Sequence, residues 1–221
     1  MNSFTLKIIA AASMLLDHIG YMFVPGWSPY RMIGRLAFPI FAFLIVEGAL
    51  HTRDFKKYVS RIAVFALISE IPYDLAIFAR PVYWGQCNIL VTFLIGLLCI
   101  KVMQKLLVHF NFSPVGYAMG TAVFLGGAAA ARLLHTDYEI YGVMLIYVFY
   151  VFRDRKVTKT LLAILVFATM PFLYFPAAAS LVLIWFYNDE RGYNPAWLRW
   201  GFYLFYPVHL IILYIVRMMT L

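Results

Sequence analysis

Residues 33–50, IGRLAFPIFAFLIVEGAL, decide the fold, because this stretch is apolar apart from Arg35 and Glu47. An α-helix needs about 20 predominantly apolar residues to cross the hydrocarbon core of a bilayer. Runs of similar character recur along the whole chain, separated by short polar stretches. The pattern predicts an all-α, polytopic membrane protein.

The composition supports this class. Of the 221 residues, 64% are hydrophobic and only 13% are charged, whereas a soluble domain is about half apolar and a quarter charged. A net charge of +8 would indicate a nucleic-acid partner in a soluble protein. Here the basic residues collect in short loops, as the positive-inside rule predicts. We therefore expect membrane lipid, and no nucleic acid, as a partner.

The apolar runs divide the chain into spans and one ambiguous region. Residues 160–187 are long for one span and short for two, and they contain Pro171 and Pro176, which interrupt helices. We predict a single domain over residues 1–221, with about eight or nine transmembrane helices, some of them short or broken by proline. The clear spans are residues 5–24, 33–50, 58–79, 89–108, 115–134, 140–152 and 200–219, and the turn PGWSP at 25–29 closes the first.

The loops predict an orientation. Residues 51–57 (HTRDFKK) and 153–159 (RDRKVTK) are strongly basic and fall on one side of the predicted bundle. Basic loops face the cytoplasm, so we expect a multi-pass protein of the inner (cytoplasmic) cell membrane with a cytoplasmic N-terminus. Cys87 and Cys99 form no metal-like pair, and no metal is expected.

Several spans carry polar groups where lipid makes them costly. In SMLLDHIGYMF, residues 13–23, Asp17 and His18 stand side by side, and a charged group at bilayer depth costs several kcal/mol by the lowest estimates. The next two spans each carry a pair of charged residues one helical turn apart, Arg31 with Arg35 and Glu70 with Asp74, and both pairs are predicted at a similar depth. The three spans together are expected to converge Asp17, His18, Arg31, Arg35, Glu70 and Asp74.

Two interpretations of this cluster stay open. In one, an arginine pairs with Glu70 or Asp74 and only locks the helices together, since intramembrane charges usually pair. In the other, the cluster is functional, and for His18 we favour this role because histidine can take up and return a proton near neutral pH. His209 in the last span either bonds a backbone carbonyl or takes part in function.

A second polar set lies at the predicted cytoplasmic boundary. Glu47 ends an apolar run inside that boundary, where it can line an entrance, and the basic loop after it can attract an anionic cofactor. For Lys56 and Lys57, setting the membrane orientation is the simpler interpretation.

Four stretches carry a family resemblance: LKIIAAASMLLDHIGYMF (6–23), RMIGRLAFPIFAFLIVEGALHTRDFKKYVSRI (31–62), ALISEIPYDLAI (66–77) and FYLFYPVHL (202–210). They resemble the TraX family, named for an inner-membrane protein of conjugation systems that N-acetylates the pilin subunit. The resemblance implies an integral-membrane acetyltransferase that takes acetyl-CoA from the cytoplasm. Its acceptor would be a protein, glycan or lipid amine or hydroxyl at or beyond the outer face.

The resemblance also suggests roles for the polar residues. His18 would be the general base or a transient acyl carrier. Asp17 would set its tautomer or, since neighbours on a helix point about 100° apart, serve the third helix instead. Arg35, together with Arg31, would stabilise developing charge, and Glu70 and Asp74 would position the acceptor or hold the arginines. The catalytic candidates are therefore Asp17, His18, Arg35, Glu70 and Asp74, and the candidates for binding acetyl-CoA are Arg31, Glu47, His51, Arg53 and Lys57.

Two rival functions remain. Broken helices with intramembrane acids, histidine and arginine are also typical of proton-coupled transporters, although the two halves show no inverted repeat. A non-catalytic assembly factor for a pilus or secretion system is the third interpretation.

Overall fold

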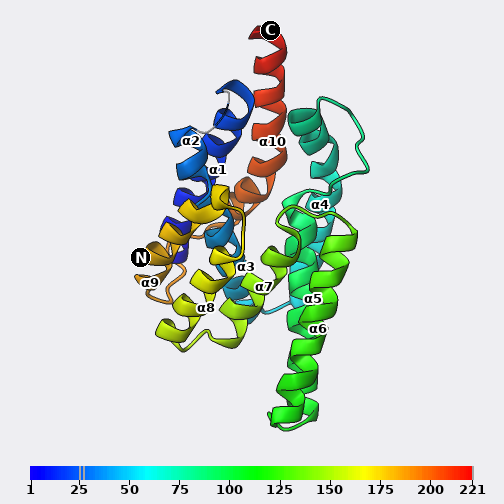
Figure 1. The fold of residues 1–221 in the computed structure, drawn as a ribbon, viewed down its shortest axis with the longest axis vertical. Helices are drawn as coiled ribbons and strands as arrows, with labels where there is room; N and C mark the ends of the chain where they lie inside the picture. Colours follow the sequence, from blue (N-terminus) through cyan, green and yellow to red (C-terminus); the bar gives the residue numbers. More distant parts are fainter. Residues whose placement is uncertain (25, 27, 221) are drawn as a thin grey trace.

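The computed structural model describes residues 1–24, 26 and 28–220, which are helical apart from turns and short loops (Figure 1). Pro25 and Trp27 of the predicted first turn lie outside the described residues. The described residues contain no β-strand, so the all-α prediction is confirmed. The helices are α1 (Ser3–Phe23), α2 (Pro29–Gly34), α3 (Ala37–His51), α4 (Phe55–Phe78), α5 (Ile89–His109), α6 (Pro114–Leu133), α7 (Glu139–Val151), α8 (Lys156–Ala168), the 3₁₀-helix η1 (Phe172–Ala179), α9 (Ser180–Trp185) and α10 (Ala196–Thr220).

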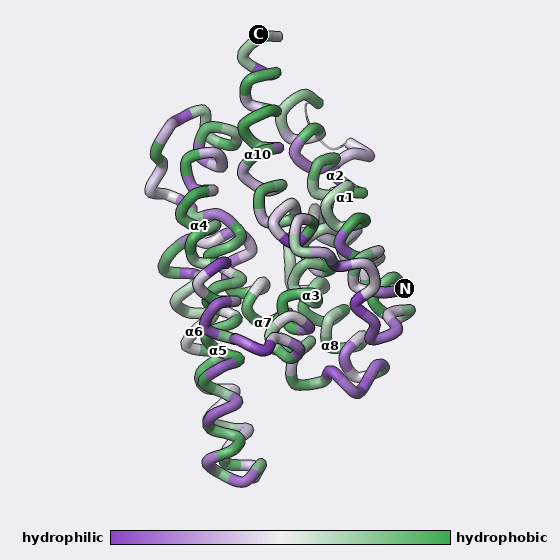
Figure 2. The backbone as a smooth tube through the Cα atoms, turned by 180° about the vertical axis from the view of Figure 1, so that it is seen from behind, coloured by the Kyte–Doolittle hydropathy of each residue, from purple (hydrophilic) through white to green (hydrophobic). Residues whose placement is uncertain are grey.

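Five helical segments are long and apolar enough to cross a membrane. They are α1, α2 with α3, α5, α6 and α10, and each agrees with a predicted span to within a few residues. The helix α4 is as long, at 24 residues, but carries charged side chains along its length. Hydrophobic residues dominate these helices, while hydrophilic residues gather in turns and at the tip of the α5–α6 hairpin (Figure 2). The chain is a helical membrane protein.

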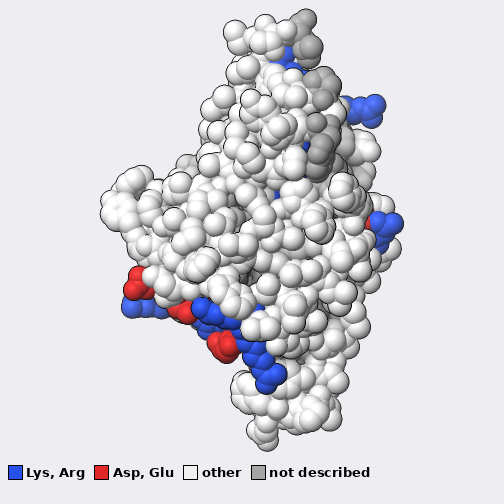
Figure 3. Space-filling view, turned by 60° about the vertical axis from the view of Figure 1, so that its left-hand side comes forward, with Lys and Arg blue, Asp and Glu red and all other residues white. Residues whose placement is uncertain are grey.

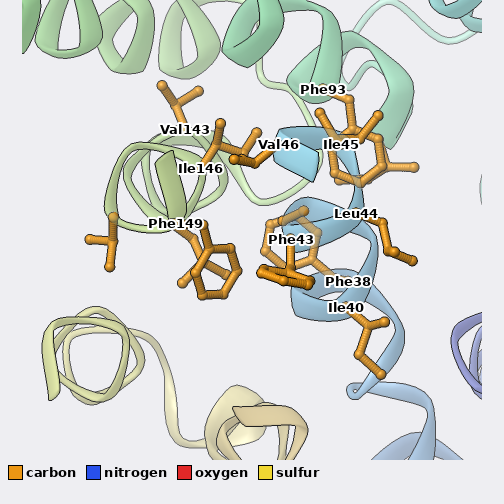
Figure 4. Close-up of a cluster of buried hydrophobic side chains, with 14 of the residues drawn as sticks. Phe38, Ile40, Phe43, Leu44, Ile45, Val46, Phe93, Val143, Ile146 and Phe149 are labelled. Carbon is orange, nitrogen blue, oxygen red and sulfur yellow. The ribbon is translucent and has the colours of Figure 1, made fainter. Parts of the chain in front are cut away.

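The helix α3 forms the centre of the bundle. It is apolar all round and most of its side chains are buried, as expected for a helix enclosed by others. The rings of Phe43 and Phe149 meet edge to face, with centroids 5.7 Å apart. Phe38 stacks in parallel with Phe93 of α5 (Figure 4). This core holds α3 against α5 and α7. It thereby fixes the positions of Arg35, just before α3, and of Glu47 near its C-terminal end.

The predicted span over residues 33–50 is interrupted once. The helix α2 ends at Gly34 and α3 begins at Ala37. Pro39, in the first turn of α3, has no N–H to donate to the carbonyl of Arg35, four residues earlier, so the helical ladder is broken there. The break directs Arg35 into the bundle, where it is 6% exposed.

The ambiguous region is neither one span nor two. Arg153, before α8, and Tyr187, after α9, both bind the carboxylate of Glu47, so the segment between them starts and ends at the same end of the bundle. The 13 residues of α8 rise about 20 Å, less than the hydrocarbon core. Pro171 precedes η1 and Pro176 lies within it, where the chain reverses. The segment α8–η1–α9 is therefore a re-entrant hairpin.

The charged loops meet at the end of the bundle that holds the N-terminus. The backbone N–H of Ser3 donates to Glu190 O at 2.8 Å, and the guanidinium of Arg191 donates to His51 O at 2.8 Å. Most charged side chains on the face shown in Figure 3 lie in a band toward this end. The N-terminus and the basic loops at 51–57 and 153–159 thus share one side, as predicted.

Candidate active site

Two histidines from opposite ends of the chain form the centre of the site. His18 Nδ1 in α1 lies 2.8 Å from His209 Nε2 in α10, and the ring centroids are 5.0 Å apart. The other ring nitrogen of His209, Nδ1, lies 2.6 Å from the carbonyl oxygen of Phe205, one turn earlier. His209 is 5% exposed, so water does not compete strongly for these bonds.

The hydrogen bonds define which nitrogens carry protons. A carbonyl oxygen can only accept, so Nδ1 of His209 must donate to Phe205. With both rings neutral, His209 then accepts at Nε2, and His18 donates to it from Nδ1. The remaining nitrogen, Nε2 of His18, keeps a free lone pair. This arrangement gives His18 the form of a base or nucleophile.

Beside His18, Asp17 lies between two arginines of the α2 region. Its carboxylate oxygens are 3.6 Å from Arg31 Nε and 3.7 Å from Arg35 Nη1. These are ion pairs without a short hydrogen bond, and Asp17 Oδ1 has no donor among the described residues. The adjacent residues Asp17 and His18 therefore point to different partners, as expected for neighbours about 100° apart on a helix.

Arg35 connects the cluster to two later segments of the chain. Its Nη1 donates to the hydroxyl of Tyr138 at 3.4 Å, and its guanidinium lies 4.5 Å from the ring centroid of Tyr174 in η1. Its Nε is buried and has no acceptor among the described residues. The turn of the re-entrant hairpin thus reaches the same site, and Arg35 has an unused donor there.

A cavity of about 110 Å³ adjoins these groups. Its charged and polar lining includes Asp17, His18, Arg35, Asp137 and Tyr138. The rest of the lining is largely apolar and includes rings from α3, α5 and α10. The volume equals that of about four waters in the liquid, enough for an acetyl-sized group with its attacking atom. The cavity can hold the reacting end of a substrate.

Asp137 and Tyr138 were not predicted as site residues. They lie in the turn before α7, where Thr92 Oγ1 donates to Asp137 O at 2.5 Å and lies 2.9 Å from Thr136 Oγ1, from which it can accept. A signal was present in the sequence, because α7 has only 13 residues and rises about 20 Å. A span this short leaves the preceding turn below the membrane surface. Tyr174 had no comparable signal.

Glu70 and Asp74 do not pair with the arginines. Among the described residues they have no ion pair with Arg31 or Arg35, whose acidic partner is Asp17. Glu70 accepts from both the backbone and the side chain of Asn88, and Asp74 accepts from the backbone N–H of Tyr83 at 2.7 Å. These two carboxylates, expected at the cluster, hold the 79–88 loop and the start of α5 instead.

Of the candidates for binding acetyl-CoA, Glu47 is enclosed in the bundle. It is 4% exposed, and Arg153 binds it through Nε at 3.0 Å and Nη2 at 3.4 Å. His51 Nδ1 lies 3.6 Å from the same carboxylate and 2.9 Å from the backbone oxygen of Glu47. The Glu47 carboxylate is thus buried and paired with Arg153 rather than exposed at the surface.

The other candidates divide between two ends of the bundle. Arg53 lies beside the start of α4, where Lys57 pairs with Asp54 at 3.3 Å. Asp54 caps α4, and the backbone N–H and ammonium group of Lys57 hold the pKa of its carboxyl below the usual range. Arg31 is sixteen residues from Glu47, about 24 Å along the α2–α3 axis. The structure separates Arg31 from the other four candidates.

Comparisons with known proteins identify a family and one relative that match nearly the whole length of the chain. Residues 3–217 match the family described as TraX protein. A "Probable fimbrial assembly protein FimC, serogroup H1" from Dichelobacter nodosus is 30% identical, in an alignment covering 96% of this chain and 94% of that protein. A protein of Rickettsia prowazekii (strain Madrid E), described as uncharacterized, is 32% identical over 92 residues, 38% of this chain and 35% of that protein. No solved structure is significantly similar.

Proposed function

Because the chain belongs to the TraX family, we propose that it is a membrane acetyltransferase that acetylates an amine or hydroxyl during the assembly of a pilus. Acetyl-CoA is the donor in this proposal. The relative described as a probable fimbrial assembly protein supports a pilus component as acceptor. The chemistry rests on the site between α1, α3 and α10.

The base in this reaction is His18. Its Nε2 takes the proton from the attacking N–H or O–H as the acceptor forms a bond to the thioester carbonyl carbon. Collapse of the tetrahedral intermediate breaks the C–S bond, and the imidazolium of His18 returns the proton to the leaving thiolate. The products are the acetylated acceptor and free CoA thiol. A positioned base of this kind contributes about 10²–10⁴-fold.

Arg35 and Tyr138 stabilise the oxyanion of that intermediate. Arg35 has a buried Nε with no acceptor among the described residues, and the hydroxyl of Tyr138 lies 3.4 Å from its Nη1. Donors that are already oriented in a site shielded from water stabilise developing negative charge strongly. Asp17 neutralises the arginine pair and keeps it in place.

The observation that carries this proposal is that a histidine with an unprotonated nitrogen lines the same cavity as a cation with an unused donor. Two histidines used only to join helices would need neither the cavity nor Arg35.

The test is thiol release from acetyl-CoA by purified protein in lipid nanodiscs, with glycinamide as a small amine acceptor. Wild type should release CoA above the uncatalysed rate, and His18→Ala should lower this at least about 100-fold. His135→Ala is the matched control, because His135 is an exposed histidine outside the cavity, 3.7 Å from Glu139. Unchanged turnover in a folded His18→Ala protein would overturn the role of His18.

The rival functions give different results. A transporter would move substrate into proteoliposomes without acetyl-CoA. If the wild-type protein neither bound nor cleaved acetyl-CoA, the enzyme hypothesis would be rejected in favour of transport. A non-catalytic assembly factor would support pilus formation equally well with His18→Ala.

A further inference from the structure

A second hollow lies away from the candidate active site, near the turn between α5 and α6. It has a volume of about 600 Å³. Its polar side chains are Lys101, Gln104, Lys105 and His109 from α5, and Tyr150 from the end of α7. The apolar side chain of Phe112, in the α5–α6 turn, completes one wall.

The basic groups of this hollow share one face of α5. Lys101, Lys105 and His109 are spaced four residues apart, which places them one above the other on the helix. Like charges at this spacing destabilise a helix slightly. These basic residues therefore make α5 slightly less stable as a helix, so helix stability does not account for their presence.

The protein supplies no negative charge to this face. Neither lysine has a carboxylate within 4.0 Å among the described residues. The sequence contains no Asp or Glu at all between Asp74 and Asp137, so the entire α5–α6 hairpin lacks acidic side chains. The positive charge of the hollow is uncompensated.

The hollow lies at the end of the bundle where the basic loops gather. The ammonium group of Lys101 lies 5.1 Å from the ring centroid of Phe55, the first residue of α4. From there α5 and α6 continue beyond the other helices (Figure 1), carrying Lys105 and His109 with them. Both cations and apolar side chains line the hollow, which suits a phosphate attached to an apolar or amphipathic molecule.

We propose that this hollow binds a phosphate group through Lys101, Lys105 and His109. Lysine ammonium groups bind phosphate as point charges. Two ligands carry this chemistry: the headgroup of an anionic phospholipid, and the phosphates of acetyl-CoA. The second rests on the proposed function, whereas the first does not.

The experiment uses Lys101→Gln/Lys105→Gln, with two probes measured separately. Retention of phosphatidylglycerol is measured by native mass spectrometry, and binding of radiolabelled acetyl-CoA is measured in phosphatidylcholine nanodiscs without an acceptor. Because lysines near a membrane surface attract anionic ligands, removing both charges should weaken binding of the true ligand at least about tenfold. Loss of lipid retention alone identifies the headgroup, and loss of acetyl-CoA binding alone identifies the cofactor.

The matched control is Arg155→Gln/Lys156→Gln, which removes two exposed charges at the same end of the bundle. It should leave both probes within about threefold of wild type. Lys101→Arg/Lys105→Arg keeps the charge and should restore most of the binding. The proposal would be overturned if Lys101→Gln/Lys105→Gln and the control Arg155→Gln/Lys156→Gln weakened binding equally. It would also be overturned if Lys101→Gln/Lys105→Gln bound both probes as well as wild type does. Because neither probe requires turnover, a failure of the proposed chemistry would not affect the lipid result.

Discussion

Gly34 of α2 lies directly against Asp17 of α1: a Cβ atom on Gly34 would be 2.3 Å from Asp17 Cβ and 2.5 Å from its Cα. Gly20 has the same role about one turn further along α1, where a Cβ would lie 2.8 Å from Tyr30 Cβ. The two glycines let α1 and α2 cross at close range. This crossing brings the carboxylate of Asp17 to the arginines and places His18 at the cavity.

Replacement of Gly34 by alanine should therefore displace α2 from α1. Backbone atoms cannot move aside, so the overpacking should cost about 1–3 kcal/mol and lower the melting temperature in detergent. Thiol release should fall more steeply than stability, because Arg35 moves with α2. Gly201→Ala, where nothing lies within 4 Å of the added methyl group, is the control and should be neutral or slightly stabilising. A fully active, fully stable Gly34→Ala protein would contradict the crossing.

His209→Ala removes the acceptor of the His18 Nδ1–H bond. We expect turnover to fall about 10–100-fold, by analogy with the loss of the hydrogen-bond partner that orients a metal-ligating histidine, with a smaller change in KM. His209 acts through His18 and is a positioning residue.

A spectroscopic measurement separates this role from simple packing. In ¹⁵N-histidine NMR, wild-type His18 should show a protonated Nδ1 and an unprotonated Nε2, whereas His209→Ala should show a mixture of tautomers. His209→Gln keeps an acceptor oxygen at this position and should recover some of the wild-type signal and rate. If His18 has the same tautomer in wild type and His209→Ala, the inferred proton arrangement is wrong.

Glu70 and Asp74 should behave as structural carboxylates. Glu70→Gln and Asp74→Asn keep an acceptor oxygen for the groups that these residues hold, so turnover should stay within a few-fold of wild type. Asn88→Ala removes a fully buried side chain that donates to Ala66 O at 2.8 Å and caps α5. It should lower stability by about 1–3 kcal/mol through unsatisfied buried groups. A loss of turnover near that of His18→Ala in Glu70→Gln would restore a catalytic role for Glu70.

The spans could be predicted from the sequence because backbone groups in lipid must bond within their own helix, so each apolar run reports a helix. The same logic did not resolve residues 160–187. In this protein the two ends of the re-entrant hairpin meet at the buried carboxylate of Glu47, which lies more than 100 residues earlier. Hydropathy carries no information about such a contact.

The site was predictable in its residue types and less so in its pairings. Asp17, His18 and Arg35 do line one cavity, since costly polar groups in lipid tend to collect where they are used. The contact between His18 and His209 joins residues 191 positions apart, and no local pattern specifies it. Helical spacing correctly placed Glu70 and Asp74 on one face, but it could not show that the face meets a loop.

The base of the re-entrant hairpin gives a prediction about stability. Arg153→Ala leaves the carboxylate of Glu47, whose side chain is 5% exposed, without its main cation. Loss of one partner of a buried ion pair costs about 3–5 kcal/mol. Glu47→Gln leaves Arg153, whose side chain is 28% exposed and also lies 3.7 Å from Asp189, with access to water. Arg153→Ala should therefore be the more destabilising change, measured as the melting temperature or the denaturant midpoint in detergent.

The double variant Glu47→Gln/Arg153→Ala tests the same contact by a thermodynamic cycle. Since the double variant leaves no buried carboxylate at position 47 without its arginine, it should be more stable than Arg153→Ala alone, with an interaction energy of about 0.5–3 kcal/mol. Lys156→Ala, an exposed change at the start of α8, is the control and should shift the midpoint by less than about 0.5 kcal/mol. Strictly additive effects of the two single changes would show that Arg153 and Glu47 are not coupled, and that another contact closes the hairpin.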